Sequence, residues 1–124
     1  RDIQVLGGAL RSGAKTLIGP ETIEMIERRV FDIVFIGVAA VEARYGFLEP
    51  TEWHAWLIHT LRARAGKMAV LADHTKFLAQ SDLPVLSFRE VDVLVTDRQP
   101  PAEHLKVIAQ NGPRVIYPGG ETEA

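Results

Sequence analysis

Hydrophobic residues follow two patterns along the chain: short continuous apolar runs, and helical spacings of three and four positions. The continuous runs are typical of buried strands and fall at 3–6, 32–36, 68–72, 91–96 and 114–117. The helical spacings predict amphipathic helices at 21–29, at 52–65 and between Pro101 and Asn111. This alternation predicts an α/β fold, a Rossmann-like layered domain with a mostly parallel sheet.

The run at 32–36, Asp-Ile-Val-Phe-Ile, is rich in β-branched and aromatic residues and ends at Gly37. Such a run predicts a central parallel strand that is covered on both faces. In sheets of this type, ligands bind beyond the carboxyl ends of the strands. The loops at 7–16, 37–50, 73–84 and 97–101 are therefore the places where we expect functional residues.

The two ends of the chain set the expected domain limits. The chain opens at Arg1 and reaches its first apolar run almost at once, which predicts that the domain is incomplete at its N-terminus. The sequence from Pro118 is polar and predicts a flexible tail over 118–124. We expect one domain over 1–117.

The loop after the strand at 68–72 has the densest chemistry in the sequence, with Asp73, His74, Thr75 and Lys76 in succession. Lys76 offers a compact positive charge to an anionic ligand, and Asp73 either orients that ammonium group or accepts a ligand hydroxyl. The alternative is structural, with Asp73 capping the turn and Lys76 pointing to water.

The loop at 37–50 contains a second charged pair, Glu42 and Arg44. The planar guanidinium of Arg44 suits a phosphate or carboxylate, and Glu42 can accept hydrogen bonds from sugar hydroxyls. The alternative is a mutual ion pair at the surface.

The loop at 7–16 nearly matches a phosphate-binding P-loop, because Gly8, Gly13, Lys15 and Thr16 follow that order. One extra residue separates Gly13 from Lys15, and no helix pattern follows at once, so we expect a turn. The Gly7-Gly8 pair permits a close backbone approach to a ligand, or forms a plain tight turn.

Composition excludes several classes of function. The chain has 14 Lys and Arg against 16 Asp and Glu, so its net charge of −2 provides no basic field for nucleic acid. There is no cysteine, and the histidine spacing does not predict a metal site. The longest apolar stretch is well short of the ~20 residues that cross a bilayer, so we expect no membrane partner.

The order of these motifs resembles the C-terminal sensor domain of DeoR-type bacterial transcriptional regulators. The resemblance covers residues 3 to about 117 and rests chiefly on Ala72 to Phe77 and on the strand end at Thr96-Asp97. The motifs in chain order are Val5-Leu6-Gly7-Gly8, Leu17-Ile18-Gly19-Pro20, Phe31 to Val38, Leu71 to Phe77 and Val91 to Asp97.

The resemblance implies an effector-sensing domain whose fold is similar to that of ribose-5-phosphate isomerase. It implies a repressor that binds a phosphorylated sugar or polyol, and that binds DNA only through a separate N-terminal helix-turn-helix domain. It also implies a cytoplasmic homo-oligomer with no cofactor, for which the helix carrying Trp53 and Trp56 is a candidate contact. The alternative is an isomerase-like enzyme that uses Glu42 or Asp73 as its base.

The resemblance also assigns an effector pocket. It implies ligand-binding roles for Asp73 and Lys76 and for the glycines of the two earlier loops, Gly7-Gly8 and Gly37. Glu42 and Arg44 are carried over from the same resemblance, in addition to their own chemistry. The chain departs from the family pattern at His54-Ala55, where the family usually has Glu-Ala, and an Asp-x-Gly-Thr-Thr-like phosphate loop is not found in these residues.

Overall fold

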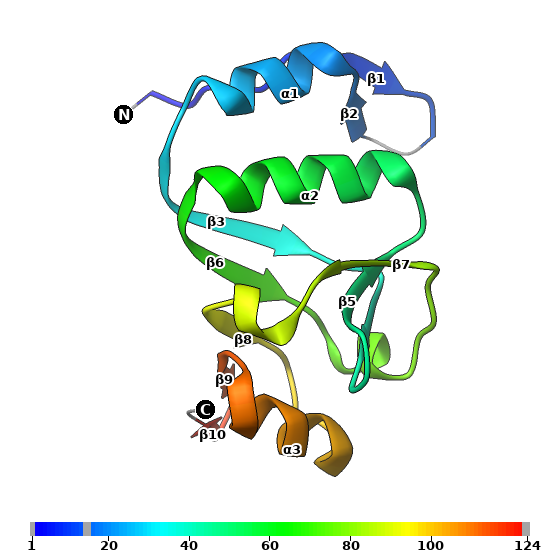
Figure 1. Cartoon of the computed structure of the whole chain (residues 1–124), viewed down its shortest axis with the longest axis vertical. Helices are drawn as coiled ribbons and strands as arrows, with labels where there is room; N and C mark the ends of the chain where they lie inside the picture. The colour runs from blue at the N-terminus through cyan, green and yellow to red at the C-terminus, as the bar shows by residue number, and fades with distance from the viewer. Residues whose placement is uncertain (1, 14–15, 123–124) are drawn as a thin grey trace.

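A computed structural model describes residues 2–13 and 16–122. The main sheet has five strands in the order β10-β9-β8-β6-β3 (Figure 1). Four of them are parallel, and β10 pairs antiparallel with β9 at one edge. These strands are β3 (Phe31–Gly37), β6 (Ala65–Leu71), β8 (Val93–Val95), β9 (Arg114–Tyr117) and β10 (Gly120–Thr122). The α/β class with a mostly parallel sheet is confirmed.

Smaller elements lie around this sheet. A second, antiparallel sheet contains β4 (Ala40–Glu42), β5 (Gly46–Glu49) and β7 (Leu83–Leu86). A hairpin joins β1 (Ala9–Arg11) to β2 (Thr16–Ile18), and the 3-10 helices are η1 (His74–Phe77) and η2 (Phe88–Glu90). The second sheet and η1 occupy about half of the segments that the sequence predicted as the loops 37–50 and 73–84.

The three helices match the predicted amphipathic segments: α1 (Pro20–Glu27), α2 (Glu52–Arg64) and α3 (Ala102–Asn111). The hydroxyl of Thr51 caps α2 by accepting the backbone N–H of His54 at 3.2 Å. Arg62 and Arg64 in the last turn suit the negative end of the helix dipole. None of the helices in the described parts of the chain has the length and apolar character needed to cross a membrane.

Both crossover helices lie on one face of the main sheet. α2 connects β3 to β6 and α3 connects β8 to β9, and both steps run in the same direction across the sheet. Right-handed crossovers that advance in one direction place their helices on the same side. The composition of the hydrophobic core supports this placement of both helices on one face. The core combines Ile58 of α2 and Ile108 of α3 with the buried sheet residues Val34, Met68, Leu94 and Val115.

The position of β3 corrects the prediction of a central strand covered on both faces. β3 is an edge strand, and its Phe35 side chain is 60% exposed. Ile33 and Leu71 are on the same uncovered face and are also exposed. The continuous apolar pattern predicted the strand but not its place, because both crossover helices cover the opposite face.

Two terminal segments also differ from the predictions. Residues 3–6 form no strand, and Ile3 is 91% exposed. The next residue, Gly7, contacts α1, where Thr22 donates a hydrogen bond to its carbonyl at 2.6 Å. A flexible tail was expected over 118–124, but Gly120–Thr122 pair with β9. Lys15 of the P-loop-like sequence lies outside the described residues, and β2, not a helix, follows it.

Candidate functional site

The carboxyl ends of β3, β6 and β8 bring three of the predicted loops together. Gly37, the last residue of β3, is opposite Leu71, the last residue of β6. The backbone N–H of Ala72 then donates to the carbonyl of Val95 at the end of β8, at 3.0 Å. The loops that follow these strands therefore begin side by side, as expected for the ligand-binding edge of a parallel sheet.

Asp73 folds the start of η1 through its side chain. Its carboxylate accepts the backbone N–H of Thr75 at 2.8 Å and also the Thr75 hydroxyl. These hydrogen bonds hold the pKa of Asp73 below its ordinary value, and the charge of Lys76 lowers it further. Of the two interpretations of Asp73, the structure shows the turn cap, and Lys76 beside it is half-buried.

His74 ties η1 to the end of β8. Its backbone N–H donates to one carboxylate oxygen of Asp97 at 2.6 Å, and its Nδ1 lies 2.7 Å from the other. The side-chain hydrogen bond from His74 is the main reason that the pKa of Asp97 is lowered. Because η1 is held at both Asp73 and His74, the backbone that carries Lys76 is fixed in position.

Glu49, at the end of β5, is a buried acidic residue near Lys76. Its side chain is only 7% exposed, and burial raises its pKa from the ordinary value. The positive fields of His54 and Lys76 and the backbone N–H of Ala39 oppose this rise. Ala39 follows β3 almost directly, so Glu49 lies beneath the carboxyl end of that strand.

The sequence analysis did not identify Glu49 as a site residue. A signal was present, because Glu49 directly follows Phe47 and Leu48 and precedes the Pro50-Thr51 start of α2. A charged residue at the end of a buried apolar run is unusual. Only the tertiary structure shows that His54 of the neighbouring helix and Lys76 are close to it.

Glu42 and Arg44 lie on a separate pocket of about 500 Å³ between the β4–β5 turn, the end of η1 and the start of α3. In the described chain these two side chains form no ion pair; Arg44 instead stacks on the ring of Tyr45, 5.1 Å from its centroid. The pocket wall includes His104, whose Nε2 lies 3.0 Å from the Val41 carbonyl.

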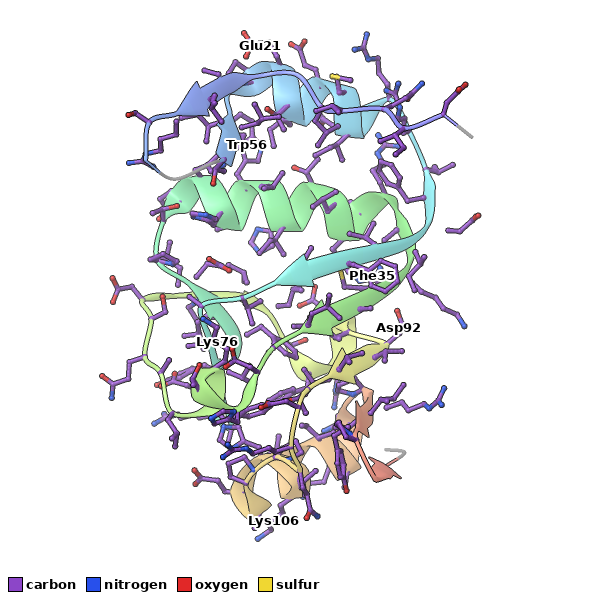
Figure 2. The ribbon with its side chains drawn as sticks, turned by 180° about the vertical axis from the view of Figure 1, so that it is seen from behind. Glu21, Phe35, Trp56, Lys76, Asp92 and Lys106 are labelled. Atoms are coloured by element: carbon purple, nitrogen blue, oxygen red, sulfur yellow. The ribbon has the colours of Figure 1, made fainter. Side chains whose placement is uncertain are left out.

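Gly7 and Gly8 are not brought to the other five predicted residues. Gly7 contacts Met25 of α1, and a Cβ on Gly8 would clash with the Thr22 hydroxyl. α2 lies between α1 and the strands of the main sheet (Figure 1). Figure 2 shows the same separation, with Glu21 of α1 at one end of the molecule and Lys76 beyond α2.

The four histidines have separate partners. In residues 2–13 and 16–122, no three His, Asp or Glu side chains form a group that could hold a metal ion. The partners are Thr51 for His54, the Val85 carbonyl for His59, Asp97 for His74 and the Val41 carbonyl for His104.

This arrangement defines a class of protein. It is an α/β domain whose polar loop residues Asp73, His74 and Asp97 lie at the carboxyl edge of a parallel sheet, which is where such domains bind ligands. The chain also matches the family model described as the DeoR C terminal sensor domain over residues 1–98. The chain therefore belongs to the DeoR C-terminal sensor domain family.

Curated relatives agree with this family. The chain is 30% identical over 115 residues to the HTH-type transcriptional regulator GlpR of Haloferax volcanii, covering 93% of this chain and 45% of that protein. It is 28% identical to the transcriptional repressor CsqR of Escherichia coli K12, covering 94% of this chain and 45% of that protein. It is 27% identical to the glycerol-3-phosphate regulon repressor of the same strain, with coverages of 88% and 43%. The chain thus spans under half the length of these relatives.

Proposed function

We propose that this chain is the effector-sensing domain of a DeoR-family transcriptional repressor and that it binds a phosphorylated sugar or polyol. The observation that carries the proposal is the placement of Lys76, which lies at the carboxyl edge of the sheet on a turn fixed by Asp73 and His74. In this role the Lys76 ammonium binds the phosphate, and nearby carboxylates accept hydrogen bonds from hydroxyl groups. Gly37 leaves room for the ligand where β3 ends.

The proposed repressor contacts DNA through a separate helix-turn-helix domain. A net charge of −2 does not favour DNA binding by this chain itself. The relatives, of which this chain covers 45%, are named HTH-type transcriptional regulators or repressors. The effector binds two arrangements of the repressor with different affinities. It therefore changes the fraction of repressor molecules in the arrangement that binds the operator. Such a protein acts in the cytoplasm.

A sensor releases its ligand unchanged, whereas an isomerase-like enzyme would convert it. The relatives carry repressor names, which supports the non-catalytic role. Incubation with pentose and hexose phosphates, followed by product analysis, separates the two. We expect saturable binding without turnover; turnover that is lost on substitution of Glu42 or Asp73 would establish the enzyme instead.

We further propose that the sensor assembles as a homo-oligomer. The exposed Trp56 packs edge-on against Trp53 of the same helix, with ring centroids 5.7 Å apart. Exposed aromatic side chains are common at subunit contacts. In this proposal α2 carries both the subunit contact at Trp56 and His54 at its start, so the helix connects the subunit interface to the proposed effector site.

Replacement of Lys76 tests the proposed site. Lys76→Ala is expected to lower the affinity for phosphorylated effectors at least tenfold, about 1.4 kcal/mol of binding free energy, because the phosphate loses its positive partner. Isothermal titration calorimetry with glycerol 3-phosphate and glucose 6-phosphate measures the change. Lys106→Ala on the exposed side of α3 is the matched control and should leave affinity unchanged (Figure 2). Equal affinities of wild type and Lys76→Ala would exclude Lys76 as the anchor.

A further inference from the structure

His104 is a buried polar side chain with one ring nitrogen unused. It lies in the first turn of α3 and is 3% exposed. Its Nε2 lies 3.0 Å from the Val41 carbonyl, and its ring packs edge-on against Phe77 with centroids 5.1 Å apart. Its Nδ1 is buried and has no hydrogen-bond partner among the residues that the structure describes. Buried polar atoms in proteins are rarely left unpaired, so this nitrogen needs an explanation.

The contact with Val41 determines what kind of group Nδ1 is. A carbonyl oxygen can only accept a hydrogen bond, so the ring nitrogen beside it, Nε2, carries the hydrogen. In the neutral ring, Nδ1 then has a lone pair and no hydrogen, and it is a hydrogen-bond acceptor. The contacts with Val41 and Phe77 explain the ring at position 104, but they leave this acceptor unsatisfied.

The same ring lines the pocket of about 500 Å³ between the β4–β5 turn, the end of η1 and the start of α3. Small-molecule sites in proteins have volumes of this order. The carboxylates of Glu42 and Glu103 also line the pocket, and neither takes part in an ion pair in the described chain. The pocket wall therefore combines three acceptor groups, Nδ1 and two carboxylates.

The pocket wall also has hydrogen-bond donors. Arg44 and Gln80 belong to it, and the Arg44 guanidinium lies over the Tyr45 ring, 5.1 Å from the centroid. Donors and acceptors together suit hydroxyl groups, because a hydroxyl both donates and accepts. The wall has two carboxylates and one guanidinium, so an anionic ligand meets an excess of negative charge. The lining therefore favours an uncharged ligand with several hydroxyl groups.

We propose that this pocket is a second ligand site, which binds a small uncharged sugar or polyol without a phosphate group. One ligand hydroxyl donates to Nδ1 of His104, and others donate to the carboxylates of Glu42 and Glu103. Protein atoms cover Nδ1, so a side chain of the wall moves aside when the hydroxyl reaches it. Lys76 does not line the pocket, and the site is therefore distinct from the phosphate anchor proposed above.

Glucose and glucuronate test the class of ligand, because glucuronate has a carboxylate where glucose has a hydroxymethyl group. Titrations of this chain followed by ¹H–¹⁵N NMR measure both affinities. We expect saturable shifts of the Ala43 and Ala79 amides, which lie in the pocket wall, and at least fivefold weaker binding of glucuronate. The ¹⁵N signal of His104 Nδ1 should move with glucose as the nitrogen accepts a hydrogen bond. Equal affinities, a stationary Nδ1 signal or no saturable shift of these amides would overturn the proposal.

Two variants test the named acceptors. Glu42→Gln should lower the glucose affinity at least fivefold, because an amide accepts hydrogen bonds less strongly than a carboxylate. Glu24→Gln, the same substitution at an exposed position of α1, is the control and should leave the affinity unchanged. His104→Gln removes Nδ1 but keeps a donor for the Val41 carbonyl, and it should lower the affinity as far as Glu42→Gln does. Variants that lose stability but bind glucose as the wild type does would assign both side chains to the fold alone and overturn the proposal.

Inorganic phosphate tests whether this site is separate from the one proposed at Lys76. Saturating phosphate should leave the glucose affinity within twofold of its value without phosphate. Displacement of glucose by phosphate would show one shared site and would overturn the proposal of a second one.

Discussion

At the scale of single residues, three carboxyl groups near the carboxyl ends of the strands have opposite environments. Asp73 and Asp97 are exposed and hydrogen-bonded, and both have lowered pKa values. Glu49 is buried, and its pKa is raised mainly because burial removes its hydration. The environment of the first two therefore stabilises their charged form, whereas burial makes the charged form of Glu49 less favourable than it is in water.

The raised pKa of Glu49 predicts the pH dependence of one variant. A carboxyl whose folded-state pKa lies above its unfolded value of about 4.5 contributes stability below that value, and the contribution is lost as pH rises through the folded-state pKa. Glu49→Gln removes this loss. We therefore expect the variant to be more stable than wild type at pH 7 and the difference to shrink towards zero below the ordinary pKa of glutamate.

Urea unfolding at a series of pH values measures this difference. The control is Glu24→Gln, which should show no such trend with pH. A Glu49→Gln protein that is less stable than wild type at pH 7 would mean that the charged carboxylate has a close partner and stabilises the fold.

At the scale of elements, Thr51 at the start of α2 has two roles. The Thr51 hydroxyl accepts the His54 backbone N–H and also lies within hydrogen-bonding distance of the His54 ring. One side chain therefore both begins the helix and orients the His54 ring. The helix could be predicted from its spacing, but this second role required the side-chain geometry.

Loss of the cap should be measurable. Thr51→Ala removes the acceptor for an N-terminal N–H of α2 and is expected to lower the free energy of unfolding by about 1 kcal/mol. Thr60→Ala is the matched control, because the Thr60 hydroxyl only donates to the Trp56 carbonyl within the same helix and is near the surface. Denaturant titration compares the two, and equal losses would show that capping is not the cause.

At the scale of the whole molecule, the two sheets share one core with α2 and α3. His59 joins α2 to the Val85 carbonyl of β7 at 2.8 Å, and His104 joins α3 to the Val41 carbonyl of β4. Leu94 is fully buried in β8, where it pairs in register with Val70 of β6 and Val115 of β9. Because these contacts link distant segments, we expect the described elements to unfold cooperatively.

A cavity created by substitution of Leu94, at the centre of the sheet, tests whether the described elements unfold cooperatively. Leu94→Ala should lower the free energy of unfolding by about 2 to 5 kcal/mol, since buried apolar area is lost and a void is left. Leu78→Ala removes the same atoms from a side chain that is 81% exposed and should cost about 0.5 kcal/mol or less. Circular dichroism and tryptophan fluorescence during unfolding should coincide; a large loss in Leu78→Ala would contradict the assignment of the core.

The sequence alone determined the local structure of most segments. Helical spacing, Thr51 and the basic end of α2 predicted that helix within a residue, and the apolar runs predicted β3, β6, β8 and β9. The ordered motifs also predicted the family. These properties depend on residues that are neighbours in the chain, and they can therefore be predicted from the local sequence pattern.

Only the tertiary structure decided which segments meet. It placed β3 at an edge, left residues 3–6 without a strand partner, and separated Gly7 and Gly8 from Lys76. It also buried the charged Glu49 at the end of β5. The physical reason is that strand order and burial are set by contacts between residues far apart in sequence, whereas periodicity and capping report only on residues a few positions away.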